Sequence, residues 1–157
     1  MAPSLTLQKE EHRTALLRKM GFPPKTRSLI LLDISDPLIR EFLQKAGREL
    51  DISFIESNGS SDEKGDYPAF DVFISDEQTG FLDIVALVKA GVTPILPKKN
   101  AFGSNFSEFD PMKFTGNAFL FESTESYHIL EKLVRYLENV RYPGDRRTLL
   151  KNLEKTF

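Results

Sequence analysis

The sequence contains no cysteine, which excludes disulfides, thiolate nucleophiles and cysteine-based metal sites. Histidine is scarce as well: His12 and His128 lie too far apart in the chain to suggest a metal cluster, and no metal site is expected. There is no apolar run of about 18 residues and no signal-peptide hydrophobic region, so we expect a cytoplasmic protein without membrane contact. A net charge of -2 gives the chain as a whole no electrostatic reason to bind nucleic acid.

What the sequence does contain is an alternation of short apolar runs with amphipathic segments. Strands buried on both faces are expected at 28–34, 51–56, 69–75, 92–97 and 117–121. Helices are expected at 7–20, 36–50, 81–91, 125–140 and 145–157. Residues 57–68 are predicted to form a polar, mobile loop, and 98–115 to be irregular or to hold one short helix. Two helix caps are predicted: Asp36, with Pro37 at the first helical position, and Ser123 or Thr124.

This alternation favours an α/β protein with a sheet covered by helices on both faces. Right-handed crossovers then give a three-layer, doubly wound sandwich around a mainly parallel five-stranded sheet, either Rossmann-like or flavodoxin-like. We expect a single domain over 1–157. Its parts are an N-terminal helix and linker at 1–27, an α/β core at 28–140 and a C-terminal helix at 141–157.

In such a fold, ligands bind outside the carboxyl ends of the strands. The polar residues that follow the expected strands are Asp33, Ser35, Asp36, Glu56, Ser57, Asn58, Asp76, Glu77, Gln78, Lys98, Lys99, Asn100, Glu122 and Ser123. This rim is mixed in sign, leans acidic and lacks the glycine-rich turn that lets a backbone approach a pyrophosphate. Ordinary solvated loop ends would show the same pattern.

Two segments, "LLDISDPLIREFLQKA" and "FDVFISD", resemble response-regulator receiver domains. The resemblance implies Asp76 as phosphoacceptor, with Asp33 and Asp36 holding Mg²⁺. Receivers place two adjacent acids after the first strand, whereas here two residues separate them. The lysine that receivers carry after the fifth strand falls near Glu122, a reversed charge, so a working receiver is not expected. The alternative that this resemblance leaves open is a receiver-like signalling domain that no longer takes phosphate.

A more specific resemblance runs through "SDEQTGFLDIVALVKAGVTPILPKKNAFGSNFSEFDP", "TGNAFLFE", "YHILEKLVRYLE" and "YPGDRRTLLKNLEKTF". These segments resemble the C-terminal half of bacterial glycogen and starch synthases, two-domain glucosyltransferases of the GT-B type. "HRTALLRKMGFPPKTRSLILL" resembles the helix and first strand of the same half. Residues 36–70 do not match, and about one strand-helix unit of the family is missing there. The resemblance implies a Rossmann-like domain that binds a nucleotide sugar.

The residues that do chemistry in the synthases are mostly replaced. The glutamate that contacts the donor sugar nucleotide falls on Gln78, beside Glu77, and the Thr-Gly-Gly turn falls on 99–101. The Arg and Lys that hold the donor phosphates after the first strand have no counterparts, and Asp33 and Asp36 would repel a diphosphate there. The acceptor-binding N-terminal domain has no counterpart either.

The resemblance therefore implies a degenerate relative, not active alone, that binds a nucleotide sugar, a glucan or a protein. The ligand-binding candidates are Glu77, Gln78, Lys98, Lys99 and Asn100. No cofactor is expected, and Mg²⁺ enters only under the receiver alternative. The other alternative is the donor-binding subunit of a split glycosyltransferase.

Two further segments are candidates for binding a protein partner. Six phenylalanines lie within the segment 102–121, where they either pack onto the sheet or form an aromatic surface. The C-terminal end of the chain carries a cluster of basic residues. The default interpretation is a solvent-exposed face that complements the helix dipole, and the second interpretation is a docking surface for a partner. The members of the cluster are Arg141, Arg146, Arg147, Lys151 and Lys155.

Overall fold

The computed structural model describes residues 5–23 and 26–157. Five parallel strands form one sheet in the order β2-β1-β3-β4-β5. The strands are β1 (Ser28–Asp33), β2 (Ile52–Glu56), β3 (Val72–Ser75), β4 (Thr93–Pro97) and β5 (Phe119–Phe121). This is the flavodoxin-like strand order, and it confirms the predicted doubly wound α/β fold.

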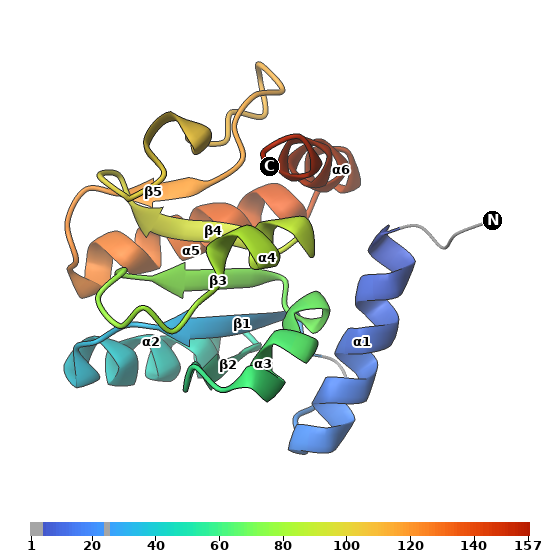
Figure 1. The fold of residues 1–157 in the computed structure, drawn as a ribbon, viewed down its shortest axis with the longest axis vertical. Coiled ribbons are helices and arrows are strands. Elements are labelled where there is room, and N and C mark those ends of the chain that lie inside the picture. Colours follow the sequence, from blue (N-terminus) through green and yellow to red (C-terminus); the bar gives the residue numbers. More distant parts are fainter. Residues whose placement is uncertain (1–4, 24–25) are drawn as a thin grey trace.

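Helices cover both faces of the sheet (Figure 1). On one face lie α2 (Pro37–Glu49) and α5 (Ser126–Val140), and on the other lie the short α3 (Ser61–Gly65) and α4 (Ile84–Lys89). The last helix, α6 (Pro143–Glu154), packs against both α4 and α5. The first, α1 (Leu5–Met20), lies across the end of the sheet at which the strands begin.

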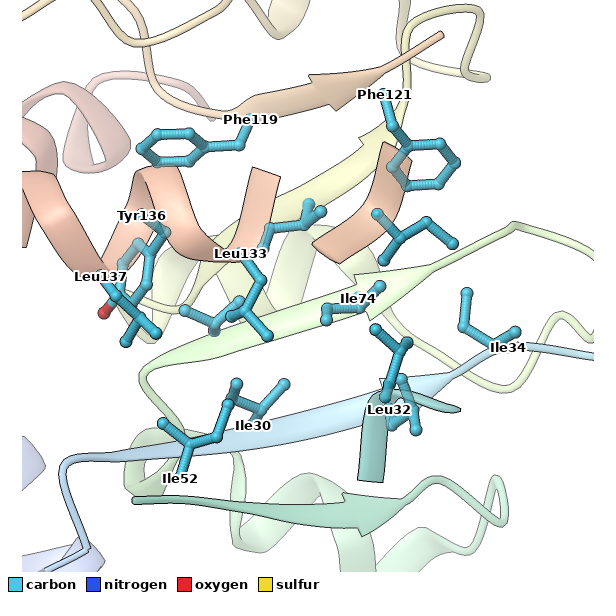
Figure 2. Packing of buried hydrophobic residues seen from close by; sticks show 14 of the residues in the cluster. Ile30, Leu32, Ile34, Ile52, Ile74, Phe119, Phe121, Leu133, Tyr136 and Leu137 are labelled. Carbon is cyan, nitrogen blue, oxygen red and sulfur yellow. The ribbon is translucent and has the colours of Figure 1, made fainter. Parts of the chain in front are cut away.

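Strand β1 shows why the sequence reads as a continuous apolar run. All six of its residues are buried, and successive side chains enter opposite cores. Ile30 and Leu32 join the cluster under α2 and α5, whereas Leu29 and Leu31 join the cluster under α1 and α4. Figure 2 shows the first of these cores, in which Ile30 and Leu32 lie on the same side of the sheet as residues of α5.

The prediction of a polar loop at 57–68 was wrong in part. This segment forms α3 and a short 3-10 turn at Tyr67–Ala69, and it is organised by Glu63, which is only 9% exposed. The Glu63 carboxylate accepts hydrogen bonds from Ser57 Oγ at 2.7 Å and from the Asn58 N–H at 3.1 Å. The polar composition of this segment suggested that its side chains are solvated. Instead, the Glu63 carboxylate is buried and accepts the hydrogen bonds of other polar groups in the same segment.

The ends of three helices test the capping predictions. Asp36 caps α2 as predicted, since its Oδ1 accepts the Leu38 N–H at 2.9 Å. Ser123 and Thr124 do not cap α5. The N-cap residue is Glu125, whose side chain makes no capping hydrogen bond, and Ser123 Oγ is hydrogen-bonded to His128 Nδ1 at 2.8 Å. The last helix begins at Pro143 and not at 145, because proline suits the first helical position, where an N–H has no partner.

The phenylalanine-rich segment mostly packs inward. Phe106, Phe109, Phe119 and Phe121 are buried, and Phe114 is 68% exposed. A protein partner for this segment, or for the C-terminal helix, stays a prediction. Within the described ranges, no helix combines the length and apolar character that crossing a membrane requires.

Candidate functional site

The candidate site lies at the edge of the sheet where the strands end, on the adjacent strands β1 and β3. Asp33 closes β1 in register with Ser75 of β3, and Asp76 follows directly, donating its N–H to the Asp33 carbonyl at 3.1 Å. Both carboxylates are only 4% exposed. The strand order thus brings together two buried acids that lie 43 positions apart in the sequence (76 minus 33).

Asp33 has both of its oxygens occupied by hydroxyl groups. Its Oδ2 accepts a hydrogen bond from Ser75 Oγ at 2.9 Å, and its Oδ1 accepts one from Thr79 Oγ1 at 2.6 Å. A buried carboxylate is costly unless such donors surround it. The bonds therefore fix the loop after β3 to the end of β1 and leave Asp33 little capacity for a ligand.

Asp76 is occupied in the same way. Its Oδ2 accepts both the N–H of Ser35 at 2.8 Å and the Oγ of Ser35 at 2.6 Å, and its Oδ1 accepts the Gln78 N–H at 3.1 Å. The third acid of the receiver interpretation, Asp36, is occupied as the cap of α2. Across the described part of the chain, no three acidic or histidine side chains are grouped so as to hold a metal ion.

The turns after β3 and β4 bind each other through Glu77. This residue adopts a φ of +61°, a left-handed conformation that is uncommon for a side chain other than glycine. Its carboxylate accepts the Ala101 N–H, with the two oxygens 3.3 and 3.2 Å from the nitrogen. The Asn100 side chain closes its own turn, donating to the Pro97 carbonyl at 3.0 Å and accepting the Phe102 N–H at 3.0 Å.

This geometry bears on the turn that replaces Thr-Gly-Gly. None of the residues 99–101 adopts a positive φ, so the turn does not use the conformations that glycine makes accessible. The Ala101 amide, which lies where the synthase resemblance places a phosphate- or sugar-binding backbone, is occupied by Glu77. The turn is therefore built around a contact within the chain.

The remaining predicted residues do not converge on one point. Lys98 pairs with Glu122 across the ends of β4 and β5 at 3.1 Å, and both side chains are mostly exposed. Gln78 is exposed and donates from Nε2 to the Asp76 carbonyl at 3.3 Å. Lys99 is exposed and has no hydrogen-bond or ion-pair partner within the described residues.

A small cavity of about 200 Å³ opens at this edge. It is lined by Asp33, Ser75, Glu77, Gly80, Leu82, Ile84 and Phe102. The only charged groups in this lining are the acids Asp33 and Glu77. Pockets for small molecules usually measure about 300 to 1,000 Å³, so this cavity is small as well as acidic.

The start of α4 beside this cavity is held by a further acid, Asp83. Its Oδ1 caps the helix by accepting the Ala86 N–H at 3.1 Å, and its Oδ2 accepts a bond from Lys64 Nζ at 2.8 Å. The bond to Lys64 is the main reason that the pKa of Asp83 lies below its usual value. Burial raises the pKa of the neighbouring Tyr67, whose hydroxyl accepts the Asp83 N–H at 3.2 Å.

Sequence reasoning missed Ser75 and Thr79 as partners of Asp33, and the Ala101 amide as the partner of Glu77. Serine and threonine directly after buried strands are a weak signal for such networks. Which carboxylate a hydroxyl reaches depends on β1 and β3 being neighbours, and the sequence does not specify that pairing.

Among solved structures, the chain is similar to the catalytic domain of starch synthase IV from Arabidopsis thaliana bound to ADP and acarbose. The TM-score is 0.70 and the identity 20%, over 94% of this chain and 38% of that one. The expected likeness to the starch synthases is thus confirmed at the level of the fold, and this chain spans well under half of that structure. No protein-family model and no curated protein matches the sequence.

Proposed function

We propose that this chain is a non-catalytic relative of the nucleotide-sugar-binding half of glycogen and starch synthases, acting as a binding or regulatory domain. The starch synthase fold and the motifs after β3, β4 and α5 support the relationship. The observation that supports the absence of catalysis is the composition of the sheet edge where the strands end. Its cavity presents Asp33 and Glu77 as its charged groups, and the Thr79 hydroxyl and the Ala101 amide beside it are bonded to these two acids.

Electrostatics make this edge unsuitable for a sugar nucleotide. A diphosphate placed there meets two carboxylates, and like charges about 4 Å apart repel by about 4 kcal/mol at the effective dielectric of a protein surface. The two lysines at this edge do not offset the repulsion, since Lys98 is paired with Glu122 and neither lysine lines the cavity. Losing one preorganised electrostatic contact reduces a rate by about 100- to 1,000-fold, and here several are replaced.

The test is a transfer assay together with calorimetry on the purified chain. ADP-glucose, UDP-glucose and a maltooligosaccharide are titrated separately, and release of nucleoside diphosphate is followed with donor and acceptor combined. We expect no turnover. The variant Glu77→Gln, which removes one acid from the cavity, should also show none. Turnover of either donor by the chain alone would contradict the proposal.

The split-transferase alternative has a separate outcome in the same assay. Activity that appears only after a co-purifying chain is added would identify this protein as a donor-binding subunit. In that case, Glu77 and Ala101 must separate when the partner binds, because their contact occupies the amide. Protection of the Ala101 amide from hydrogen exchange, compared with and without the partner, reports that separation.

A receiver-like signalling domain is the second candidate, and the strand order β2-β1-β3-β4-β5 favours it. The candidate phosphoacceptor Asp76 is 4% exposed, with both oxygens accepting hydrogen bonds. Incubation with acetyl phosphate and Mg²⁺, followed by mass spectrometry, distinguishes the two proposals. A phosphate adduct in the wild type that is absent from Asp76→Asn would favour the receiver.

A further inference from the structure

A second cavity, of about 220 Å³, lies at the opposite end of the sheet, where the strands begin. Four arginines line it, and they come from four parts of the chain. They are Arg13 of α1, Arg27 before β1, Arg141 after α5 and Arg146 of α6. Figure 1 shows α1 and the start of α6 at this end of the sheet, far from the candidate site at the carboxyl ends.

The floor of this arginine-lined cavity is buried and polar. Asp71 is 7% exposed, and its Oδ2 accepts the Leu29 N–H at 2.8 Å and lies 3.3 Å from Arg13 Nη1. The Tyr136 hydroxyl and Ser28 belong to the same lining, and burial raises the pKa of Tyr136 far above its usual value, so this phenol stays neutral. In Figure 2 the Tyr136 hydroxyl lies at the end of the sheet where β1 begins.

Positive charge in this cavity exceeds negative charge. Asp71 is the one acid in the lining, and Arg13 compensates it, while Arg141 pairs with Glu138 at 3.5 Å. Within the described residues, the Arg27 guanidinium donates only to the Leu137 carbonyl, at 3.4 Å. The Arg146 side chain has no hydrogen-bond or carboxylate partner within the described residues, although it is half-buried.

The buried Lys9 lies in the same electrostatic environment. Its Nζ donates to the carbonyls of Pro68, Phe70 and Ala90, at 3.3, 2.6 and 3.3 Å. Burial is the main cause that lowers the pKa of Lys9 to about 8; the negative charge of Asp71 raises this pKa, and the positive charges of Arg146 and Arg13 lower it. The charges of Arg146 and Arg13 thus extend to the buried Lys9, and Asp71 offsets part of their effect.

We propose that the arginine-lined cavity binds a phosphate dianion, either inorganic phosphate or the phosphate of a small phosphorylated metabolite. A guanidinium presents paired N–H donors that match the oxygens of a phosphate, and Arg27 and Arg146 supply two such groups without an acid partner. Ser28 and Tyr136 add hydroxyl groups to the lining. The volume suits a phosphate group and is too small for a whole nucleotide.

This proposal is independent of what the carboxyl-end edge does. A failure of the proposed function, such as turnover of a sugar nucleotide, leaves the arginine-lined cavity unchanged. A failure of phosphate binding leaves the acidic edge unchanged. The two sites share none of their lining residues, so each experiment reports on its own end of the sheet.

The test is a titration of the full chain with inorganic phosphate and, separately, with glycerol phosphate, by calorimetry and by ¹⁵N NMR at constant ionic strength. We expect saturable shifts of the Ser28, Asp71 and Arg146 amides. Arg146→Gln should weaken binding at least about tenfold, the effect of losing one charge-assisted contact. Arg147→Gln is the matched control, because this exposed arginine is next in the same helix and does not line the cavity.

The two ligands distinguish the source of the phosphate. Equal affinities indicate recognition of the phosphate alone, and tighter binding of glycerol phosphate indicates a phosphorylated metabolite; both support the proposal. Equal weakening by Arg146→Gln and Arg147→Gln, or an absence of saturable shifts at the cavity, would overturn it. If Arg146→Gln does not fold, the shifts of the wild-type chain test the proposal: saturable shifts at Ser28, Asp71 and Arg146 support it, and their absence overturns it.

Discussion

The two ends of the same sheet use their polar residues in opposite ways. Where the strands end, Asp33 and Asp76 take up the hydroxyls and amides of the neighbouring loops, so the acids are satisfied within the chain. Where the strands begin, guanidiniums outnumber carboxylates, and the Arg146 side chain has no hydrogen-bond or ion-pair partner within the described residues. A doubly wound fold places its usual ligand site at the carboxyl ends. Here the unused binding capacity lies at the other end.

The largest effect is expected from removing the acid of the arginine-lined cavity. Asp71→Asn leaves Arg13 without its carboxylate and weakens the bond to the Leu29 N–H. Breaking a buried pair by removing one partner costs about 3 to 5 kcal/mol, so we expect a loss near the lower figure, because Arg13 is partly exposed. Urea denaturation measures it. Asp62→Asn, at an exposed acid, is the control and should change stability by less than about 0.5 kcal/mol. Similar losses in both variants would contradict the structural role of Asp71.

A pH-dependent effect of nearly the same size is expected at Lys9. Because its pKa is lowered from 10.5 to about 8, the unfolded chain binds more protons than the folded chain between these two pH values. The free energy of unfolding should therefore rise with pH over this range, by about 3 kcal/mol for this group alone.

The variant Lys9→Met isolates the contribution of Lys9 to the pH dependence of the free energy of unfolding. Tyr67 and Tyr136, whose pKa values are raised by burial, titrate in the opposite sense in both proteins, so the difference between wild type and variant reports Lys9. Urea denaturation of both proteins at several pH values between about 8 and 10.5 gives the slope of the free energy of unfolding against pH for each. Parallel curves would show that Lys9 is not held in the buried environment described.

At the carboxyl-end edge, the buried acid should matter more than the exposed one. Asp76→Ala leaves the Ser35 N–H and hydroxyl without their acceptor, at a cost of about 2 kcal/mol. Asp36→Ala removes only a helix cap, at a cost of about 1 kcal/mol. Thermal unfolding of the two variants gives the order. A reversed order would mean that the Asp76 network is not formed in solution.

The smallest effect is expected at Lys98. Its ion pair with Glu122 joins two side chains that are 62% and 69% exposed, and such pairs contribute about 0 to 1 kcal/mol. Lys98→Ala should therefore leave the midpoint of urea denaturation almost unchanged, in low and in high salt. A loss comparable to that of Asp76→Ala would indicate that Lys98 takes part in the network at the acidic edge.

The fold was largely predictable because its signals are local. The apolar run of β1 encodes burial on both faces, and Asp36 followed by Pro37 encodes the start of α2. The loop at 57–68 was mispredicted because a single buried acid, Glu63, orders it through bonds that composition does not reveal.

The sites were less predictable, because their partners are set by tertiary structure. The expected site residues do lie at the carboxyl ends, yet their bonds depend on β1 pairing with β3. The arginine-lined cavity combines residues from α1, the start of β1, the end of α5 and the start of α6. The sequence indicated Arg141 and Arg146 only as members of a basic surface, and Arg13 and Arg27 not at all.

The most direct test of this contrast is one ¹⁵N NMR experiment, in which ADP-glucose is added to the chain already saturated with inorganic phosphate. We expect phosphate to shift the amides of Ser28 and Arg146, and ADP-glucose then to leave the amides of residues 76–79 and 100–101 unchanged. Saturable shifts of those amides on adding ADP-glucose, with none at Ser28 or Arg146 on adding phosphate, would reverse the roles assigned to the two ends and contradict the central claim.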